Sequence, residues 1–267
     1  MTDERDRINR SAPGPSDATP SRGESPSPRP DREPRRSPPV LSVIVPTYNE
    51  RDALPLLVSR LAELGRELPI ELVVVDDASP DGTGVVADEM AKSGPVPITV
   101  IHRPGKSGLA SAVLAGAAAA HAPVVTVMDA DLSHPPELLP ALWQAIQGGA
   151  DIAVASRYIP GGGVERWPLM RRIVSRVATF AARAGLRLRV RDPLSGFFAV
   201  RGELLTGYPY RGLGYKLLVE ILSTHRTRRA AEIPYRFVDR QRGKSKMGVG
   251  EILAFLKLLW HLRVRRP

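Results

Sequence analysis

The stretch VVTVMDADLSHPP, Val124 to Pro136, determines how the rest of this sequence is interpreted. Its first five residues, Val124 to Met128, are apolar and rich in β-branched side chains, which predicts a buried strand. The triplet Asp129-Ala130-Asp131 follows, and the alternation of an extended chain would place the two carboxylates on one side with Ala130 facing away. The two prolines that end the stretch predict a helix over 137–147.

Two carboxylates this close together repel each other unless a cation lies between them. Mg²⁺ or Mn²⁺, held by one or two carboxylates and by substrate phosphates, is the usual partner of such a pair. Ser133 would add a further oxygen, so the predicted metal ligands are Asp129, Asp131 and Ser133. The alternative is that the two aspartates only cap the turn before the helix.

Composition limits the classes of protein that this chain can belong to. Its 267 residues fit one large domain or two small ones, and the net charge of +10 favours anionic partners such as nucleotide phosphates, nucleic acid or an acidic membrane face. The chain has no cysteine, which excludes disulfides and cysteine-ligated zinc. No run of 18 apolar residues occurs, so an ordinary membrane-spanning helix is not expected.

Strand and helix patterns alternate through the first two thirds of the chain, which predicts an α/β fold with a mostly parallel, doubly wound sheet. Expected strands cover 40–45, 70–75, 98–101, 124–128 and 151–155, with helices between them. Further along, the pattern predicts amphipathic helices over 169–188 and 251–262, a helix over 215–222 and a strand over 232–238. We expect a disordered Pro/Ser/Arg-rich tail over 1–39, the main domain over 40–247 and a C-terminal helix with a basic end over 248–267.

Polar residues follow the first two strands at the edge where open α/β sheets bind ligands. Tyr48 could stack on a nucleobase, and Glu50 could accept a hydrogen bond from a ribose hydroxyl or a base. Asp76 and Asp77 repeat the pattern after the second strand. The alternative for each group is helix capping or a turn.

Basic residues offer candidate phosphate ligands. The stretch Gly105 to Gly108 resembles half a phosphate loop, but the full Walker pattern is absent, which excludes a P-loop ATPase. Arg157 follows the fifth expected strand and suits a phosphate. Lys216, Arg240 and Lys246 could line a closing loop, or they could be ordinary solvated charges. The two amphipathic helices combine apolar residues with arginines, as interfacial helices do.

Taken together, these residues resemble family 2 glycosyltransferases of the GT-A fold, most closely the branch that makes polyprenyl (dolichyl) phosphate mannose. The resemblance runs from Val40 to Met247 and rests on blocks that occur in the expected order. These blocks are VIVPTYNE (43–50), VVVDDASPDGT (73–83), RPGKSGLASA (103–112), DADLSHPP (129–136), SRY (156–158), DPLSGFFAV (192–200), GYKLLVEIL (214–222) and RQRGKSKM (240–247).

The resemblance implies a role for each matched residue. Donor-binding residues would be Pro46, Tyr48, Glu50, Val75, Asp77, Asp129, Ala130, Asp131, Lys216, Arg240 and Lys246. Arg157 and Ser195 would bind the phosphate of the acceptor, and Asp131, Arg157, Arg240 and Lys246 would act in catalysis. Relatives often have Gln where this chain has Ser133, which leaves metal coordination there open.

The implied reaction is a metal-dependent, inverting transfer of mannose from GDP-mannose to a polyprenyl phosphate. The acceptor is already an anion and needs no strong general base, so catalysis consists of bringing two anions together and stabilising the departing diphosphate. We expect a peripheral enzyme on the cytosolic face of a membrane. It would depend on surface binding or on a membrane-anchoring partner protein, and no nucleic acid would take part.

Three alternatives remain open from the sequence. The same enzyme could use UDP-glucose or another nucleotide sugar. A nucleotide-sugar pyrophosphorylase is less consistent, because PTYNE stands where its Gly-rich signature would lie. A basic nucleic-acid-binding module is supported by charge alone, without an RRM, KH or zinc pattern. The absence of a QxxRW block argues against a processive polysaccharide synthase.

Overall fold

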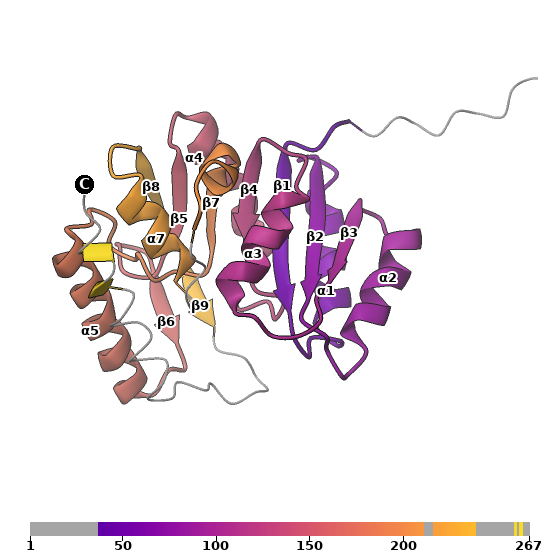
Figure 1. Cartoon of the computed structure of the whole chain (residues 1–267), viewed down its shortest axis with the longest axis horizontal. Helices are drawn as coiled ribbons and strands as arrows, with labels where there is room; N and C mark the ends of the chain where they lie inside the picture. The colour runs from indigo at the N-terminus through magenta and orange to yellow at the C-terminus, as the bar shows by residue number, and fades with distance from the viewer. Residues whose placement is uncertain (1–36, 211–215, 239–258, 261, 264–267) are drawn as a thin grey trace, which may run out of the picture. The chain divides into compact units, whose positions relative to one another are not determined.

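A seven-stranded sheet organises the part of the computed structural model that is described, namely residues 37–210, 216–238, 259–260 and 262–263 (Figure 1). The strand order is β3-β2-β1-β4-β7-β5-β8, and β7 is the antiparallel member, paired with β4 and β5. The mostly parallel α/β fold expected from the sequence is thereby confirmed. The strands are β1 (Leu41–Thr47), β2 (Ile70–Asp76), β3 (Ile98–His102), β4 (Val124–Val127), β5 (Ile152–Ser156), β7 (Phe198–Arg201) and β8 (Ala230–Pro234).

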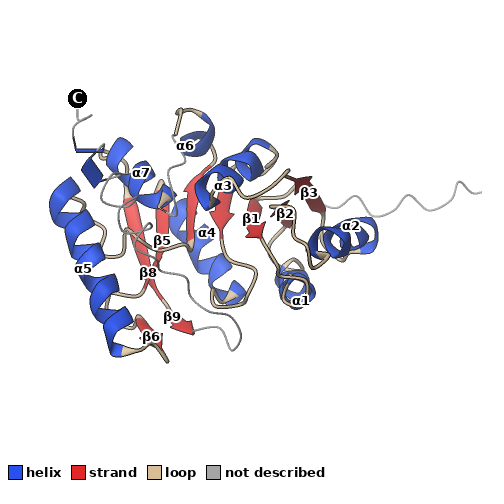
Figure 2. Ribbon diagram, turned by 60° about the horizontal axis from the view of Figure 1, so that its bottom comes forward, coloured by secondary structure: helices blue, strands red, loops and turns tan. Residues whose placement is uncertain are grey.

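Helices cover both faces of this sheet (Figure 2). One buried cluster joins the sheet to α1, α2 and α4, and a second joins it to α3, α5, α6 and α7. A short 3-10 helix, η1 (Pro136–Leu138), precedes α4. The α-helices are α1 (Leu54–Leu64), α2 (Thr83–Ser93), α3 (Leu109–Ala118), α4 (Leu139–Gln147), α5 (Leu169–Leu186), α6 (Glu203–Thr206) and α7 (Leu217–Thr224).

The central strands are composed mostly of apolar residues, and nearly every residue in them is buried. All seven residues of β2 are buried, as a strand with a helix layer on each face requires. The Ala-rich helix α3 approaches β1 so closely that a Cβ on Gly116 would lie 2.6 Å from Ile44 Cγ2. Small residues on α3 therefore set the spacing between helix and sheet, and a larger side chain at Gly116 would push the two apart.

The first strand continues through Pro46 to Thr47, beyond the expected end at residue 45. Pro46 pairs with Val75 and Thr47 with Asp76, whereas pairing with β4 ends at Ile44. Met128 donates to the Ile44 carbonyl and Asp77 to the Thr47 carbonyl, so Ile44 and Pro46 face the β4 side and Thr47 faces β2. Proline has no backbone N–H. At position 46 this N–H would point toward β4, and pairing with β4 has already ended there, so the strand tolerates proline at this position.

The expected single strand over 232–238 was wrong. The chain forms β8, which pairs with β5, and then β9 (Arg236–Val238), which pairs with β6 (Gly163–Glu165) in a separate two-stranded sheet. Tyr235 lies where the chain passes from one sheet to the other. Its N–H donates to the Ser156 carbonyl at the end of β5, and its carbonyl accepts from Gly163 N at the start of β6. This arrangement places a large aromatic side chain next to the carboxyl end of β5.

The second half differs from the sequence prediction at its helix ends. The helix α5 ends at Leu186, two residues before the predicted end, because Arg187 adopts a left-handed conformation with φ of 53°. The expected helix over 251–262 lies mostly outside the described residues, of which 259–260 and 262–263 are helical. No helix in the described segments is both long and apolar enough to cross a bilayer.

Candidate active site

The candidate residues gather where the parallel strands end. The loops that follow β1, β2, β4 and β5 emerge at one edge of the sheet, at the arrowheads in Figure 1. Tyr48, Asp77, Asp129 and Arg157 each occur within two residues after one of these strands. Ligands of open α/β sheets bind at this edge, so the fold places the predicted residues where a ligand would meet them.

Short polar side chains join the loops after β1 and β2. Asp76 accepts from Thr47 Oγ1 at 3.1 Å and from the backbone N–H of Ser79 at 3.1 Å. The Ser79 hydroxyl accepts from Asn49 N at 3.1 Å, and the Thr83 hydroxyl accepts from Glu50 N at 3.0 Å. Asp76 therefore braces the loop after β2 and does not cap α2, whose N-cap is Gly82. These bonds hold Tyr48 and Glu50 in place without using their side chains.

A cation contacts the face of Tyr48. Lys106 Nζ lies 3.1 Å from the centre of the Tyr48 ring, a cation–π arrangement. Arg103 Nη1 lies 3.2 Å from Asp77 Oδ1, and both side chains are nearly buried. Burial raises the pKa of the Asp77 carboxyl, while Arg103 acts in the opposite direction. Tyr48, Asp77, Arg103 and Lys106 thus form one polar and aromatic group at this end of the sheet.

The aspartate pair lies in a turn and not in the strand. β4 ends at Val127, and Leu132 has a φ of 60°, so the alternation used to place Asp129 and Asp131 does not reach them. Ser133 donates to Asp131 Oδ1 from its hydroxyl at 2.7 Å and from its backbone at 3.0 Å. Turn hydrogen bonds therefore set the positions of the carboxylates.

His134 supports this turn from the inside. Its Nδ1 accepts from Asp129 N at 3.0 Å, and its buried ring stacks on Phe197 with centroids 5.1 Å apart. Phe197 immediately precedes β7, so the turn after β4 rests on the antiparallel strand beside it. The structure thus gives His134 a supporting role in this turn.

The residues present fit a divalent cation that is completed by substrate. Within the described segments no three His, Cys, Asp or Glu residues cluster closely enough to hold a metal by themselves. Asp129 and Asp131 flank the turn, and the Asp129 side chain is 35% exposed, so it can reach a ligand. A Mg²⁺ or Mn²⁺ ion held by one or two carboxylates and by phosphates matches this donor set.

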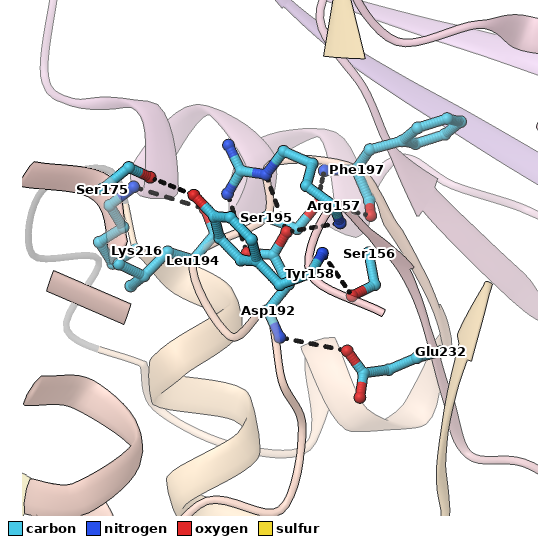
Figure 3. A network of polar contacts seen from close by, with 10 residues as sticks. All are labelled: Ser156, Arg157, Tyr158, Ser175, Asp192, Leu194, Ser195, Phe197, Lys216 and Glu232. Carbon is cyan, nitrogen blue, oxygen red and sulfur yellow. Dashed lines mark hydrogen bonds and ion pairs between the residues drawn. The ribbon is translucent and has the colours of Figure 1, made fainter. Parts of the chain in front are cut away.

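Arg157 forms the most deeply buried ion pair of the site (Figure 3). Its Nε and Nη2 donate to the two oxygens of Asp192, each at 2.8 Å, and its backbone N–H donates to Oδ2 at 2.9 Å. Glu232 accepts from the backbone N–H of Asp192 at 3.1 Å. Burial, the largest single influence, lowers the pKa of Arg157, but Asp192 outweighs it and raises this pKa above its ordinary value. The guanidinium is therefore charged and fixed in orientation.

Other predicted residues lie around this ion pair (Figure 3). Ser195 is buried, and its hydroxyl bonds the backbone of Phe197. Lys216 Nζ lies 3.5 Å from the Leu194 carbonyl, which brings the start of α7 to the loop that carries Ser195. Tyr158 donates to Ser175 Oγ at 2.8 Å and so ties the end of β5 to α5.

Tyr235 connects the aspartate turn to the ion pair. Burial raises the pKa of its phenol, Asp192 and Asp129 raise it further, and Arg157 lowers it. The charges of Asp129 on one side and of Arg157 and Asp192 on the other thus all affect the pKa of the same buried phenol. The structure brings these two groups of residues together across the intervening strand β7.

Several residues that were predicted to bind the nucleotide-sugar donor have little exposed side chain with which to contact it. The side chains of Val75 and Ala130 are fully or almost fully buried, so only their backbone could meet a ligand, and Pro46 is half-buried. Arg240 and Lys246 lie outside the described residues, so their predicted roles stay predictions.

Sequence reasoning assigned no role to Arg103, Lys106 or Asp192, although it quoted the blocks that contain them. Arg103 follows the end of β3 and Lys106 precedes the start of α3, whereas Asp192 lies in the loop between α5 and β7. That position was the available signal for Arg103 and Lys106. The pairing of Asp192 with Arg157, 35 residues away along the chain, had no counterpart in the sequence.

Comparison with known proteins places these residues in a family context. The family model described as "Glycosyl transferase family 2" matches residues 42–207. The match runs from β1 to the end of α6 and includes the aspartate turn, Arg157 and Asp192.

Two curated relatives share much of the chain. A dolichol-phosphate mannosyltransferase of Pyrococcus furiosus is 44% identical over 224 residues, which is 83% of this chain and 63% of the relative. A polyprenol monophosphomannose synthase of Mycolicibacterium smegmatis is 38% identical over 233 residues, which is 84% of this chain and 87% of the relative. The chain thus spans less than two thirds of the first relative and most of the second.

A solved structure shares the fold. Glucosyl-3-phosphoglycerate synthase from Mycobacterium tuberculosis, crystallised in complex with Mg²⁺ and uridine diphosphate, superposes with a TM-score of 0.61 and 21% identity. The superposition covers 84% of this chain and 78% of the other. It supports the GT-A-like arrangement of sheet and helices.

Proposed function

The chain belongs to glycosyl transferase family 2, and from that membership we propose that it transfers mannose from GDP-mannose to a polyprenyl phosphate. The observation that carries this proposal is the 38% identity to a polyprenol monophosphomannose synthase across 87% of that relative. The name of the Pyrococcus furiosus relative supports the same sugar and the same class of acceptor.

The loops after β1 and β2 bind the nucleoside in this proposal. The Tyr48 ring offers a stacking face, and Asp77 offers a carboxylate to the edge of the base or to the ribose. Lys106, now on the face of Tyr48, moves aside to let the base stack. Arg103 favours the ionised form of Asp77, against the effect of burial, and orients it through their 3.2 Å contact.

The aspartate turn receives the diphosphate. Asp129 and Asp131 hold a Mg²⁺ or Mn²⁺ ion, with the Ser133 hydroxyl nearby. An ion held there would supply positive charge to the departing diphosphate. The Mg²⁺ in the crystallised structure of the same fold is consistent with this assignment.

Arg157 and Lys216 attract the acceptor phosphate. Because Asp192 engages Nε and Nη2 of Arg157, Nη1 is the nitrogen that the guanidinium offers to a ligand. A phosphate oxygen attacks the anomeric carbon as the bond from that carbon to the diphosphate breaks. The electron pair leaves with the nucleoside diphosphate, no proton must move, and in-line attack inverts the anomeric centre. Arg240 and Lys246 are proposed to close over the reacting groups.

The helix α5 is proposed to lie against the cytosolic surface of a membrane, where a lipid acceptor resides. Leu169, Met170, Val177 and Phe180 are exposed large apolar residues on this helix, and arginines lie between them. An apolar side combined with cationic residues is typical of interfacial helices.

Transfer of radiolabel into an extractable lipid tests the proposal. GDP-mannose and UDP-glucose are offered separately with a short polyprenyl phosphate and Mg²⁺, with and without EDTA. We expect EDTA-sensitive label in the lipid phase from GDP-mannose alone. Label from UDP-glucose alone would overturn the sugar and keep the family. Absence of label from both donors, with source membranes added, would overturn the acceptor class.

A further inference from the structure

A cavity of about 340 Å³ lies between α5 and the end of β5. Four arginines line it, Arg157, Arg176, Arg183 and Arg191, together with Thr179 and Phe180. The residues at 176, 179, 180 and 183 follow one another at helical spacing and therefore share one face of α5. Among the residues that the structure describes, none that lines the cavity is acidic.

The cavity is positively charged because only one of its guanidinium groups is neutralised. Arg157 is paired with Asp192. Among the residues whose positions are described, Arg176, Arg183 and Arg191 have no carboxylate within ion-pair distance. Three cations facing one hollow repel each other, and an anion bound between them would relieve this repulsion.

Two buried polar atoms in the lining lack hydrogen-bond partners. Thr179 is 6% exposed, and its hydroxyl has no partner within the described part of the chain. The Nε of Arg183 is in the same situation. A buried polar group without a partner destabilises the fold by about 1–3 kcal/mol, so such groups require an explanation. A ligand oxygen between Thr179 and Arg183 would satisfy both.

Apolar surface continues from the cavity along α5. Phe180 lines the cavity and is 70% exposed, and Val177 and Ile173 are exposed one and two turns before it. A phosphate alone would use only the cationic lining. A ligand that carries both a phosphate and hydrocarbon would use the cavity and the neighbouring apolar residues together.

We propose that this cavity binds the phosphate of an anionic membrane phospholipid, whose acyl chains lie against Phe180 and Val177. The cavity adjoins the transfer site, because Arg157 lines both, but Arg176, Thr179, Arg183 and Arg191 have no assigned part in binding the donor or the acceptor. It would hold α5 at a bilayer surface whether or not an acceptor is bound. The charge of the cavity and its apolar rim are the observations that favour a lipid.

Sedimentation with vesicles tests the proposal on the full chain. Vesicles of phosphatidylcholine with and without phosphatidylglycerol are compared for the wild type, for Arg183→Gln and for Arg176→Gln/Arg183→Gln. An arginine that donates to the bound phosphate makes a charge-assisted hydrogen bond, so we expect losses of about tenfold for the single variant and about hundredfold for the double variant on phosphatidylglycerol vesicles. Binding to neutral vesicles should change little.

Arg172→Gln is the matched control, because Arg172 is an exposed arginine of α5 that does not line the cavity. We expect at most about a fivefold effect from it, which is the general contribution of one arginine near an anionic surface. Equal losses for Arg172→Gln and Arg183→Gln would mean that the whole helix attracts anions without a specific site, and would overturn the proposal.

Thr179→Val separates a ligand role from a structural one. Removing an unpartnered buried hydroxyl should raise the melting temperature, while the lost hydrogen bond should weaken phosphatidylglycerol binding about threefold. A variant that is more stable and binds vesicles as the wild type does would overturn the role of Thr179 as a ligand.

Two further measurements distinguish the source of the phosphate. Inorganic phosphate and glycerol 3-phosphate are added as competitors, and complete displacement by either at low millimolar concentration would mean a site for small anions and overturn the lipid assignment. Transfer to a short polyprenyl phosphate in detergent should stay at the wild-type level in Arg183→Gln. A raised KM there with unchanged vesicle binding would make the cavity part of the acceptor site.

Discussion

The two halves of this sheet edge hold their candidate ligand-binding residues in place by different interactions. In the half that contains β1 to β4, hydrogen bonds from many short polar side chains hold the loops together, and those of Thr47, Ser79 and Thr83 join neighbouring loops. In the half that begins at β5, one buried ion pair between Arg157 and Asp192 is the main interaction that holds the loops in place. A network of neutral donors loses little when one member changes, whereas a buried pair loses most of its effect when either partner is removed.

The halves also differ in what they expose. Leu169, Met170, Ile173, Val177 and Phe180 place a row of large apolar side chains on α5, and the helices of the first half have no comparable row. A nucleotide sugar arrives from water and needs only polar loops. The lipid acceptor of the proposed reaction would require an apolar surface beside the charged site, and the second half has such a surface.

The sharpest test of the comparison is Asp131→Asn, which removes charge from the aspartate turn between the halves. We expect kcat to fall at least about 1,000-fold with the fold intact, because the diphosphate loses the carboxylate that holds its metal. Transfer assays and circular dichroism measure the two effects. Glu137→Gln, at an exposed carboxylate in the following helical turn, is the control and should keep wild-type turnover.

Asp192→Asn tests the dependence of the second half on one pair. Arg157 would remain buried without a compensating charge, so the free energy of unfolding should fall by about 3 kcal/mol in urea titrations. Asp151→Asn removes a partner from the more exposed pairs with Arg201 and Arg228, and should cost less than about 1 kcal/mol. Equal costs would refute the contrast between the halves.

Tyr48→Leu tests the donor side. Loss of a stacking face that binds substrate and transition state alike should raise the KM for the nucleotide sugar about tenfold and leave kcat nearly unchanged. Tyr48→Phe keeps the ring and should behave as the wild type. A drop in kcat without a change in KM would contradict a role for Tyr48 in binding the base.

Glu71→Gln tests the hydrogen-bond network at the opposite end of β2. Burial alone would raise the pKa of Glu71, but hydrogen bonds from Ser42, His121 and Ala122 outweigh it and lower the pKa below 4.5. A lowered pKa means that the charged form stabilises the fold above about pH 4.5, and that this contribution is lost as the pH falls below it.

We therefore expect Glu71→Gln to lower the free energy of unfolding at neutral pH by about 1 kcal/mol and to flatten the acid limb of the stability curve. Urea titrations between pH 3 and pH 7 measure it, with exposed Glu67→Gln as control. An unchanged acid limb would show that this network contributes no pH dependence.

The sequence by itself determined the order of strands and helices through the first two thirds of the chain and the edge where ligands bind. Apolar runs that end in polar residues carry this information locally, since burial on both faces requires such runs. These runs alone therefore place the loops that contain Tyr48, Asp77, Asp129 and Arg157 at one edge of the sheet. The family blocks added expected roles to these positions.

Only the tertiary structure decided which residues meet. Asp192 pairs with Arg157, His134 supports the aspartate turn through Phe197, and β7 runs antiparallel between β4 and β5. The arginine cavity under α5 also requires β5 and the loop after α5 to come together. Such contacts join positions far apart in the chain, and hydrophobic periodicity reports only on the local environment of each residue, so no pattern in the sequence could have specified them.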